Sequence, residues 1–203
     1  MPHVVRPQIA NGFYHLTARG ARQQRLFFDE LDYGRLLSFL ASTVRRFEWR
    51  CFAYAFLPNH YHLFVQTPKP NLSAGMEVLN HRYAVRFNVR YGFAGHAFDR
   101  RFNSVVVVME QHFLELGRYI VLNPVRAGLC RLPGEWVWSS YLANVGAIEA
   151  PAFLDSGFIR GLFSEVDELG ASAFAAFVAA AHDEETLDLS SHVPVAATET
   201  WPL

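Results

Sequence analysis

The chain has 203 residues, 51% hydrophobic and 18% charged, a composition that excludes a disordered protein and allows a sizeable core. No stretch reaches the roughly 18 to 20 uncharged apolar residues of a membrane-spanning helix. The N-terminus also lacks a secretory signal, so we expect a cytoplasmic protein with no membrane partner. The formal net charge of −1 divides into a basic part, residues 1–145, and an acidic part, residues 146–203.

The first half of the chain predicts three strands and a helix. Residues 12–18 alternate polar and apolar side chains as a strand does. Residues 29–47 place leucines at helical spacing behind an acidic first turn, which predicts a helix. Residues 50–57 and 60–66 predict two strands, and the Pro-Asn dipeptide between them suits the tight turn of an antiparallel hairpin.

The middle of the chain predicts two more helices and a strand. Residues 71–92 carry an apolar face and end at a glycine, which is typical of a helix stop. Residues 104–108, SVVVV, predict a short buried strand. A last core helix is expected over about 110–122, with Pro124 as its stop, because proline disfavours the α conformation in the residue before it.

The resulting order, β-α-β-β-α-β-α, predicts an α+β fold. Its first six elements match a ferredoxin-like or RRM-like antiparallel sheet (βαββαβ) with both helices on one face, followed by an added helix. Residues 171–185 predict a further helix on propensity, and residues 190–203 should fray. We therefore expect a domain over 1–145 and a mostly helical, acidic extension over 146–203. The fold alone decides no function, because it also hosts RNA-binding modules.

Two histidines, His60 and His62, are the first candidates for chemistry. Side chains two apart in a strand share a face, so both imidazoles should point the same way and Tyr61 the other. Two neighbouring imidazoles are half of a divalent-metal site, although two hydrogen-bonded core histidines explain the pair as well. The flanking sequence lacks the Asp and His of metallo-β-lactamase-type hydrolases, and the chain is too short for an amidohydrolase barrel.

Tyr119 and Asn123 are the second candidates, because residues four apart share a helix face. The structural alternative is an aromatic core position followed by a C-capping asparagine. Together with the histidines, however, they describe one chemistry: a tyrosine oxygen can attack a phosphodiester, and a bound metal can polarise its phosphoryl oxygens. The amide oxygen of Asn123 could complete a mixed nitrogen and oxygen site, which suits Mg²⁺ or Mn²⁺.

Five stretches match, in order, the motifs of a known family: YHLTARG at 14–20, AYAFLPNHYHLFVQTP at 53–68, NLSAGMEVLNHRYAVRFNVRYGFAGHAFDRRF at 71–102, YIVLNPVRAGL at 119–129 and WVWSSY at 136–141. On these residues the chain resembles the REP-associated tyrosine transposases, a branch of the single-tyrosine HUH transposases of bacterial insertion sequences. The motifs are specific as a set, although none is specific alone.

This resemblance implies a transposase that cleaves and rejoins single-stranded, hairpin-flanked DNA through a 5′-phosphotyrosine intermediate. It implies that Tyr119 is the nucleophile, that His60 and His62 hold Mg²⁺ or Mn²⁺, and that Asn123 is the third ligand. Members of this branch are expected to be monomers, whereas smaller relatives form homodimers with shared sites. The alternative from another class is a catalytically inactive, RRM-like nucleic-acid-binding protein.

The basic part of the chain should hold the DNA, because residues 1–145 carry 17 Arg and Lys against 9 Asp and Glu. Guanidiniums would contact phosphates while aromatic rings such as Phe98 and Phe102 stack on bases. The predicted DNA-binding residues are Arg19, Arg22, Arg25, Arg82, Arg86, Arg100, Arg101, Arg118 and Arg126. His96 is expected to support the backbone or a phosphate. The acidic extension either limits DNA entry or props the sheet.

Overall fold

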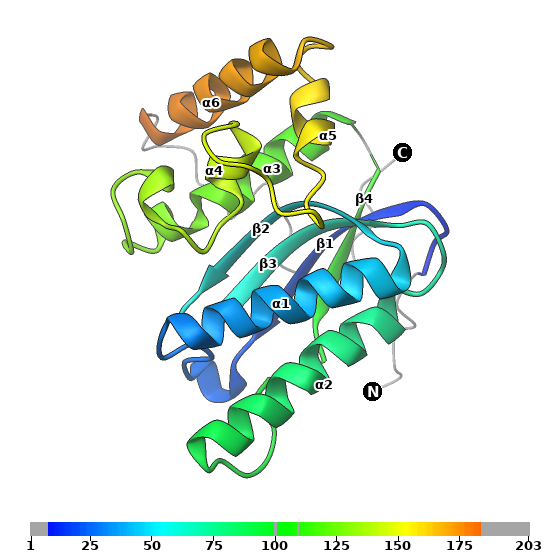
Figure 1. Cartoon of the computed structure of the whole chain (residues 1–203), viewed down its shortest axis with the longest axis vertical. Coiled ribbons are helices and arrows are strands. Elements are labelled where there is room, and N and C mark those ends of the chain that lie inside the picture. The colour runs from blue at the N-terminus through cyan, green and yellow to red at the C-terminus, as the bar shows by residue number, and fades with distance from the viewer. Residues whose placement is uncertain (1–7, 100, 109, 184–203) are drawn as a thin grey trace.

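The computed structural model describes residues 8–99, 101–108 and 110–183 and is built on one four-stranded antiparallel sheet (Figure 1). The strand order is β2-β3-β1-β4, in which β1 pairs with both β3 and β4. The strands are β1 (Gly12–Arg19), β2 (Arg50–Leu57), β3 (His60–Thr67) and β4 (Asn103–Val107). This order and the βαββαβ succession confirm the predicted ferredoxin-like fold.

The helices cover the two faces of the sheet in two groups (Figure 1). On one face lie α1 (Glu30–Phe47) and α2 (Leu72–Tyr91), as predicted. On the other side lie α3 (Glu110–Arg126), α4 (Tyr141–Asn144), α5 (Ser156–Gly161) and α6 (Asp167–Asp183). Two short 3-10 turns, η1 (Ala21–Gln23) and η2 (Pro133–Glu135), complete the regular structure of the described residues. None of the described helices is long and apolar enough to cross a membrane.

The sheet separates two hydrophobic cores, because successive side chains of a strand point to opposite faces. Tyr14 and Leu16 of β1 and Leu63 of β3 are fully buried in the core under α1 and α2. Phe52 and Phe64 belong to the second core, under α3 and its neighbours. The functional candidates must therefore be sorted by the face on which they lie.

Helix α3 does not stop at Pro124, so that prediction is wrong. The helix continues to Arg126 and ends before Gly128, whose φ of +68° is the left-handed conformation in which helices often stop. Pro124 lies in the last turn, where its missing N–H removes only one helical hydrogen bond. The backbone beyond it stays paired, since the amide of Leu129 donates to the Pro124 carbonyl at 3.0 Å. Tyr119 and Asn123 therefore do share one uninterrupted helix.

The described part of the acidic extension belongs to the second core. Ile159 of α5 and Phe174 and Val178 of α6 are fully buried there. The ring of Phe158 lies 4.1 Å from that of Phe52 on β2, which ties α5 to the sheet. Helix α5 was not predicted, and α6 begins at Asp167 rather than at 171. Of the two roles expected for the extension, these contacts favour support of the sheet over restriction of DNA entry. The predicted frayed tail at 190–203 lies outside the described residues.

Candidate active site

His60 and His62 lie at the start of β3 on the face covered by α3. In the register of the sheet His62 is opposite Thr17, and His60 is opposite Arg19 at the end of β1. Tyr61, between them, points to the other face, where its hydroxyl donates to the Asn80 side-chain oxygen at 2.5 Å. The alternation expected from the sequence is therefore present.

A third histidine, His15 of β1, completes the cluster and was missed by the sequence analysis. Its Nε2 lies 2.9 Å from Nδ1 of His62, and the two rings stack 5.2 Å apart at 14°. Both side chains are buried. The other ring nitrogen of His62, Nε2, is buried without a hydrogen-bond partner. A buried polar atom in that state is rare and marks a position that a ligand could satisfy.

His60 is held by its neighbour in the hairpin turn, Asn59. The side-chain oxygen of Asn59 accepts from His60 Nδ1 at 2.6 Å, while its amide group donates to the carbonyl of Gln23 at 3.4 Å. The second contact fixes which end of the amide faces the imidazole. His60 Nδ1 therefore carries the proton, and Nε2 is left with a lone pair.

Helix α3 brings Tyr119 against this cluster. The centroid of its ring lies 5.7 Å from those of both His15 and His62, and it meets them nearly edge-on, at 79° and 85°. The guanidinium of Arg126 lies 5.5 Å from the centroid of the same ring. A phenol from one helix thus meets imidazoles from two strands, although the three segments are far apart in the sequence.

All three imidazoles of the cluster are neutral near pH 7. Burial lowers the pKa of His15 to about 4. Burial, helped by the positive charge of Arg19, lowers the pKa of His60 to about 4 as well. The pKa of His62 is well below its ordinary value, first through burial and then through the two neighbouring histidines and Arg19. Neutral imidazole is the form that binds metals, so these shifts keep lone pairs available.

The donor set fits a hard divalent cation only if atoms other than His, Cys, Asp and Glu side chains contribute. Among the described residues, no group of three such side chains could hold a metal ion. Asn123 lies one turn after Tyr119, and its side-chain NH2 donates to the Tyr119 carbonyl at 2.8 Å, so its side-chain oxygen is the end of the amide that can act as a ligand. Two imidazoles, one amide oxygen and water are a set that Mg²⁺ or Mn²⁺ accepts.

The predicted arginines separate into three groups. Arg19 and Arg126 flank the histidines and Tyr119, and the five other exposed ones are Arg22, Arg25, Arg82, Arg86 and Arg101. Arg118 is buried between Glu115, 2.5 Å away, and the ring of Phe177 on α6, which argues against the predicted phosphate contact. Arg82 donates to Ser42 of α1 at 2.6 Å, behind the sheet. Arg100 lies outside the described residues.

The prediction that Phe98 and Phe102 stack on bases is wrong. Both are buried in the core under α1 and α2, where Phe98 meets the ring of Tyr61 edge-on. The reason is that Phe98 forms a bridge with Gly20 just beyond β1. This pairing extends the sheet edge and turns the ring inward.

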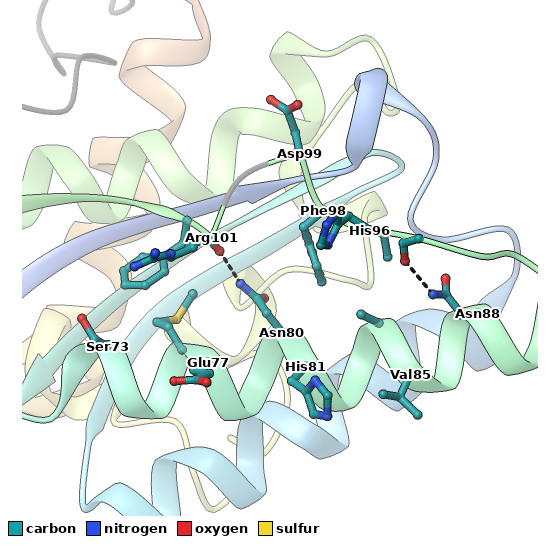
Figure 2. Close-up of a pocket in the computed structure, with 15 residues that line it drawn as sticks. Ser73, Glu77, Asn80, His81, Val85, Asn88, His96, Phe98, Asp99 and Arg101 are labelled. Carbon is teal, nitrogen blue, oxygen red and sulfur yellow. Dashed lines mark hydrogen bonds between the residues drawn. The ribbon is translucent and has the colours of Figure 1, made fainter. Parts of the chain in front are cut away.

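A recess of about 820 Å³ lies behind the sheet, between α2 and residues 95–99, 101 and 102 (Figure 2). His96 lines it, together with His81 and Glu77, so His96 is not part of the histidine cluster. Asn80 at its wall is fully engaged, with Tyr61 and with the carbonyl of Arg101 at 2.8 Å. Neither the histidine pair nor Tyr119 lines this recess.

Comparisons with known proteins concern the family and the fold of the chain. The family model described as "Transposase IS200 like" matches residues 8–122. A solved REP-associated tyrosine transposase bound to a REP hairpin is similar in fold, with a TM-score of 0.62, 20% identity and coverage of 75% of this chain and 90% of the other. A chain from Deinococcus radiodurans R1 with a provisional transposase assignment matches with a TM-score of 0.42, 18% identity and coverage of 59% and 95%. No curated protein matches.

Proposed function

Since the chain belongs to the IS200-like transposase family, we propose that it cleaves and rejoins single-stranded, hairpin-flanked DNA through a 5′-phosphotyrosine on Tyr119. The observation that carries the proposal is the contact of the Tyr119 ring with the buried, neutral His62, whose Nε2 has no partner. A nucleophile beside an imidazole that can bind a metal suits metal-assisted transfer of a phosphoryl group to tyrosine.

In the proposed reaction the Tyr119 oxygen attacks the scissile phosphorus, and the bond from phosphorus to the 3′ oxygen breaks. The Tyr119 hydroxyl loses its proton to water, the 3′ oxygen takes up a proton from water and leaves as a hydroxyl, and the 5′ phosphate stays on the tyrosine as a diester. The attack of another 3′ hydroxyl reverses the step and rejoins DNA, so no nucleotide cofactor is consumed. When bound by His60, His62 and Asn123, Mg²⁺ or Mn²⁺ would polarise the phosphoryl oxygens and stabilise the leaving oxygen.

The neighbouring residues have supporting roles in this proposal. Helix α3 holds the phenol rigidly, which limits the entropy lost on reaching the attacking geometry. Arg126 lies beside the Tyr119 ring, where its guanidinium would contact the phosphate that is attacked. Arg19, opposite His60 in the sheet, would contact a phosphate of the same strand. The DNA surface is proposed to continue through the exposed Arg22 and Arg25, whereas Arg86 on α2 and Arg101 at the recess lie, like Arg82, behind the sheet.

A monomer suits this site, because one chain supplies both the histidine pair and the tyrosine. The ring contacts between Tyr119 and the strands lie within one molecule. No second subunit is therefore needed to complete the set. By analogy with the fold neighbour that is bound to a REP hairpin, we propose a DNA hairpin with a single-stranded flank as the partner.

The test is incubation with labelled single-stranded hairpin DNA and Mn²⁺, followed by denaturing electrophoresis. The wild-type chain should form a labelled covalent adduct, and Tyr119→Phe should form none while its DNA affinity stays nearly unchanged. Tyr141→Phe, which alters a partly buried tyrosine of α4, is the matched control and should retain the adduct. An adduct that survives Tyr119→Phe would refute the nucleophile. A wild-type chain that binds the hairpin without forming an adduct would instead be the inactive nucleic-acid binder.

A further inference from the structure

We infer that His15 is a positioning residue that fixes the tautomer of His62, so that Nε2 of His62 presents its lone pair to the cation. The inference rests on the proposed function, because it concerns the same metal site. It adds to the site a residue of β1, outside the histidine pair of β3. The family match assigns no role to this residue. Three observations carry it: the bond between the two rings, the unpartnered nitrogen of His62 and the parallel arrangement at His60.

The bond between His15 Nε2 and His62 Nδ1, 2.9 Å long, allows only two proton arrangements between neutral rings. If His15 donates from Nε2, His62 Nδ1 accepts, and the proton of His62 must sit on its own Nε2. That arrangement buries an N–H with nothing to receive it and removes the lone pair. If His62 donates from Nδ1, His15 accepts, and Nε2 of His62 becomes a free metal donor. Only the second arrangement is compatible with metal binding.

His60 shows the same design with a different acceptor. Its Nδ1 donates to the Asn59 side-chain oxygen, which leaves Nε2 as the donor atom. Both histidines of the pair thus form a hydrogen bond through Nδ1, which leaves Nε2 of each ring to bind the cation. Metal-binding histidines in proteins commonly have this partner on the second nitrogen, and it orients the ring as well as the proton.

The position of His15 explains how its side chain reaches His62. On β1 it is opposite Phe64 in the register, and its ring stacks against His62 two residues along β3. A side chain of β1 that accepts from His62 has to extend from β1 to β3 on this buried face. The stacked imidazole of His15 does so with its Nε2. The ring of His15 also meets Tyr119 edge-on, so the same side chain supports the proposed nucleophile.

The first experiment needs no metal and no DNA. In the metal-free chain labelled with ¹⁵N-histidine, long-range ¹H–¹⁵N spectra should show His62 protonated at Nδ1 and unprotonated at Nε2. His15→Leu should give a mixture of both His62 tautomers, whereas His15→Gln, whose side-chain oxygen can take the place of Nε2, should restore the wild-type pattern. His81→Gln, an exposed histidine on α2, is the control and should change nothing at His62. A wild-type His62 protonated at Nε2, or a tautomer unchanged in His15→Leu, would overturn the inference.

The second experiment measures Mn²⁺ affinity by titration of the free ion's electron-paramagnetic-resonance signal. His15→Leu should weaken binding by about 10- to 100-fold, the usual effect of losing such a partner, and His15→Gln should recover most of it. Equal weakening in both variants, with unchanged thermal stability, would instead make His15 a direct ligand. If the wild-type chain binds no Mn²⁺, the proposed metal site fails, while the tautomer spectra still decide the role of His15.

Discussion

The two faces of the central sheet differ in the role of the side chains that point to them: one face is a hydrophobic core, and the other carries the histidine cluster. On β3, Tyr61 and Leu63 point into an aromatic and aliphatic core under α1 and α2. His60 and His62 point to the other face, where a polar cluster interrupts the second core beside Tyr119. Stability and chemistry are thus separated by a single residue step, and substitutions at adjacent positions should have opposite consequences.

The largest effect is expected from removing the imidazoles of the histidine pair. His60→Ala and His62→Ala should each abolish Mn²⁺-dependent adduct formation and the stabilisation that Mn²⁺ gives. At a concentration 100 times the dissociation constant, a ligand stabilises the folded state by about 2.7 kcal/mol, and this increment should disappear. Thermal unfolding with and without Mn²⁺ measures it, with His81→Ala as the matched control. A full Mn²⁺ shift in either cluster variant would mean that the metal binds elsewhere.

A cavity on the other face of β3 should give the opposite result. Leu63 is fully buried under α1 and α2, so Leu63→Ala should cost about 2 to 5 kcal/mol of unfolding free energy. Its Mn²⁺ affinity should remain close to that of the wild type at temperatures where the variant is folded. Urea unfolding and metal titration of the same preparation test both parts. A loss of metal affinity equal to that of the histidine variants would contradict the separation of the faces.

The stability of the metal-free chain should fall as the pH is lowered from about 6.5 to about 4. The folded-state pKa of His15 is about 4, below its value of 6.5 in the unfolded chain, so the unfolded chain binds more protons in this window. For His15 alone the loss would be about 3 kcal/mol, with full stability above pH 6.5. Urea unfolding of chelator-treated protein across this range measures it. The unfolding free energy should fall less steeply with decreasing pH in His15→Leu than in the wild type. Parallel curves for the two proteins would contradict the lowered pKa of His15.

The smallest effect is expected from the central residue of the pair's motif. Tyr61→Phe removes the hydroxyl that donates to Asn80 and leaves a buried amide oxygen without its partner, which should cost about 1 to 3 kcal/mol. Adduct formation per folded molecule should be unchanged, because the hydroxyl lies on the face away from the site. Denaturant unfolding and the electrophoretic assay together test this. Loss of the adduct in a stably folded Tyr61→Phe would show that the two faces are coupled.

The sequence predicted those parts of the fold and site that depend on local periodicity. Alternation along β3 gave the shared face of His60 and His62, and the order of elements gave the sheet with both α1 and α2 on one side. The helical spacing of Tyr119 and Asn123 was also recoverable, although Pro124 hid the end of α3. Such features are fixed within a few residues of one another.

The features that were missed depend on pairing between distant segments. His15 meets His62 only because of the register of β1 against β3, and no local pattern contains that register. Phe98 is turned into the core by its bridge to Gly20, although His96 and Asp99 close by in the sequence are exposed. Arg118 is buried by α6, a helix that begins almost 50 residues later in the chain. One signal was available for His15: it alternates with the apolar Tyr14 and Leu16, as the histidines of β3 alternate with their neighbours.

The central claim is that a tyrosine from α3 and two histidines from β3 converge on one cation. The most direct measurement is anomalous X-ray diffraction from crystals of the chain soaked in Mn²⁺. The account predicts a manganese peak within bonding distance of Nε2 of both His60 and His62, with the Tyr119 hydroxyl beside it. A manganese peak at other side chains, or a peak at the histidines with the Tyr119 hydroxyl far from the ion, would contradict it.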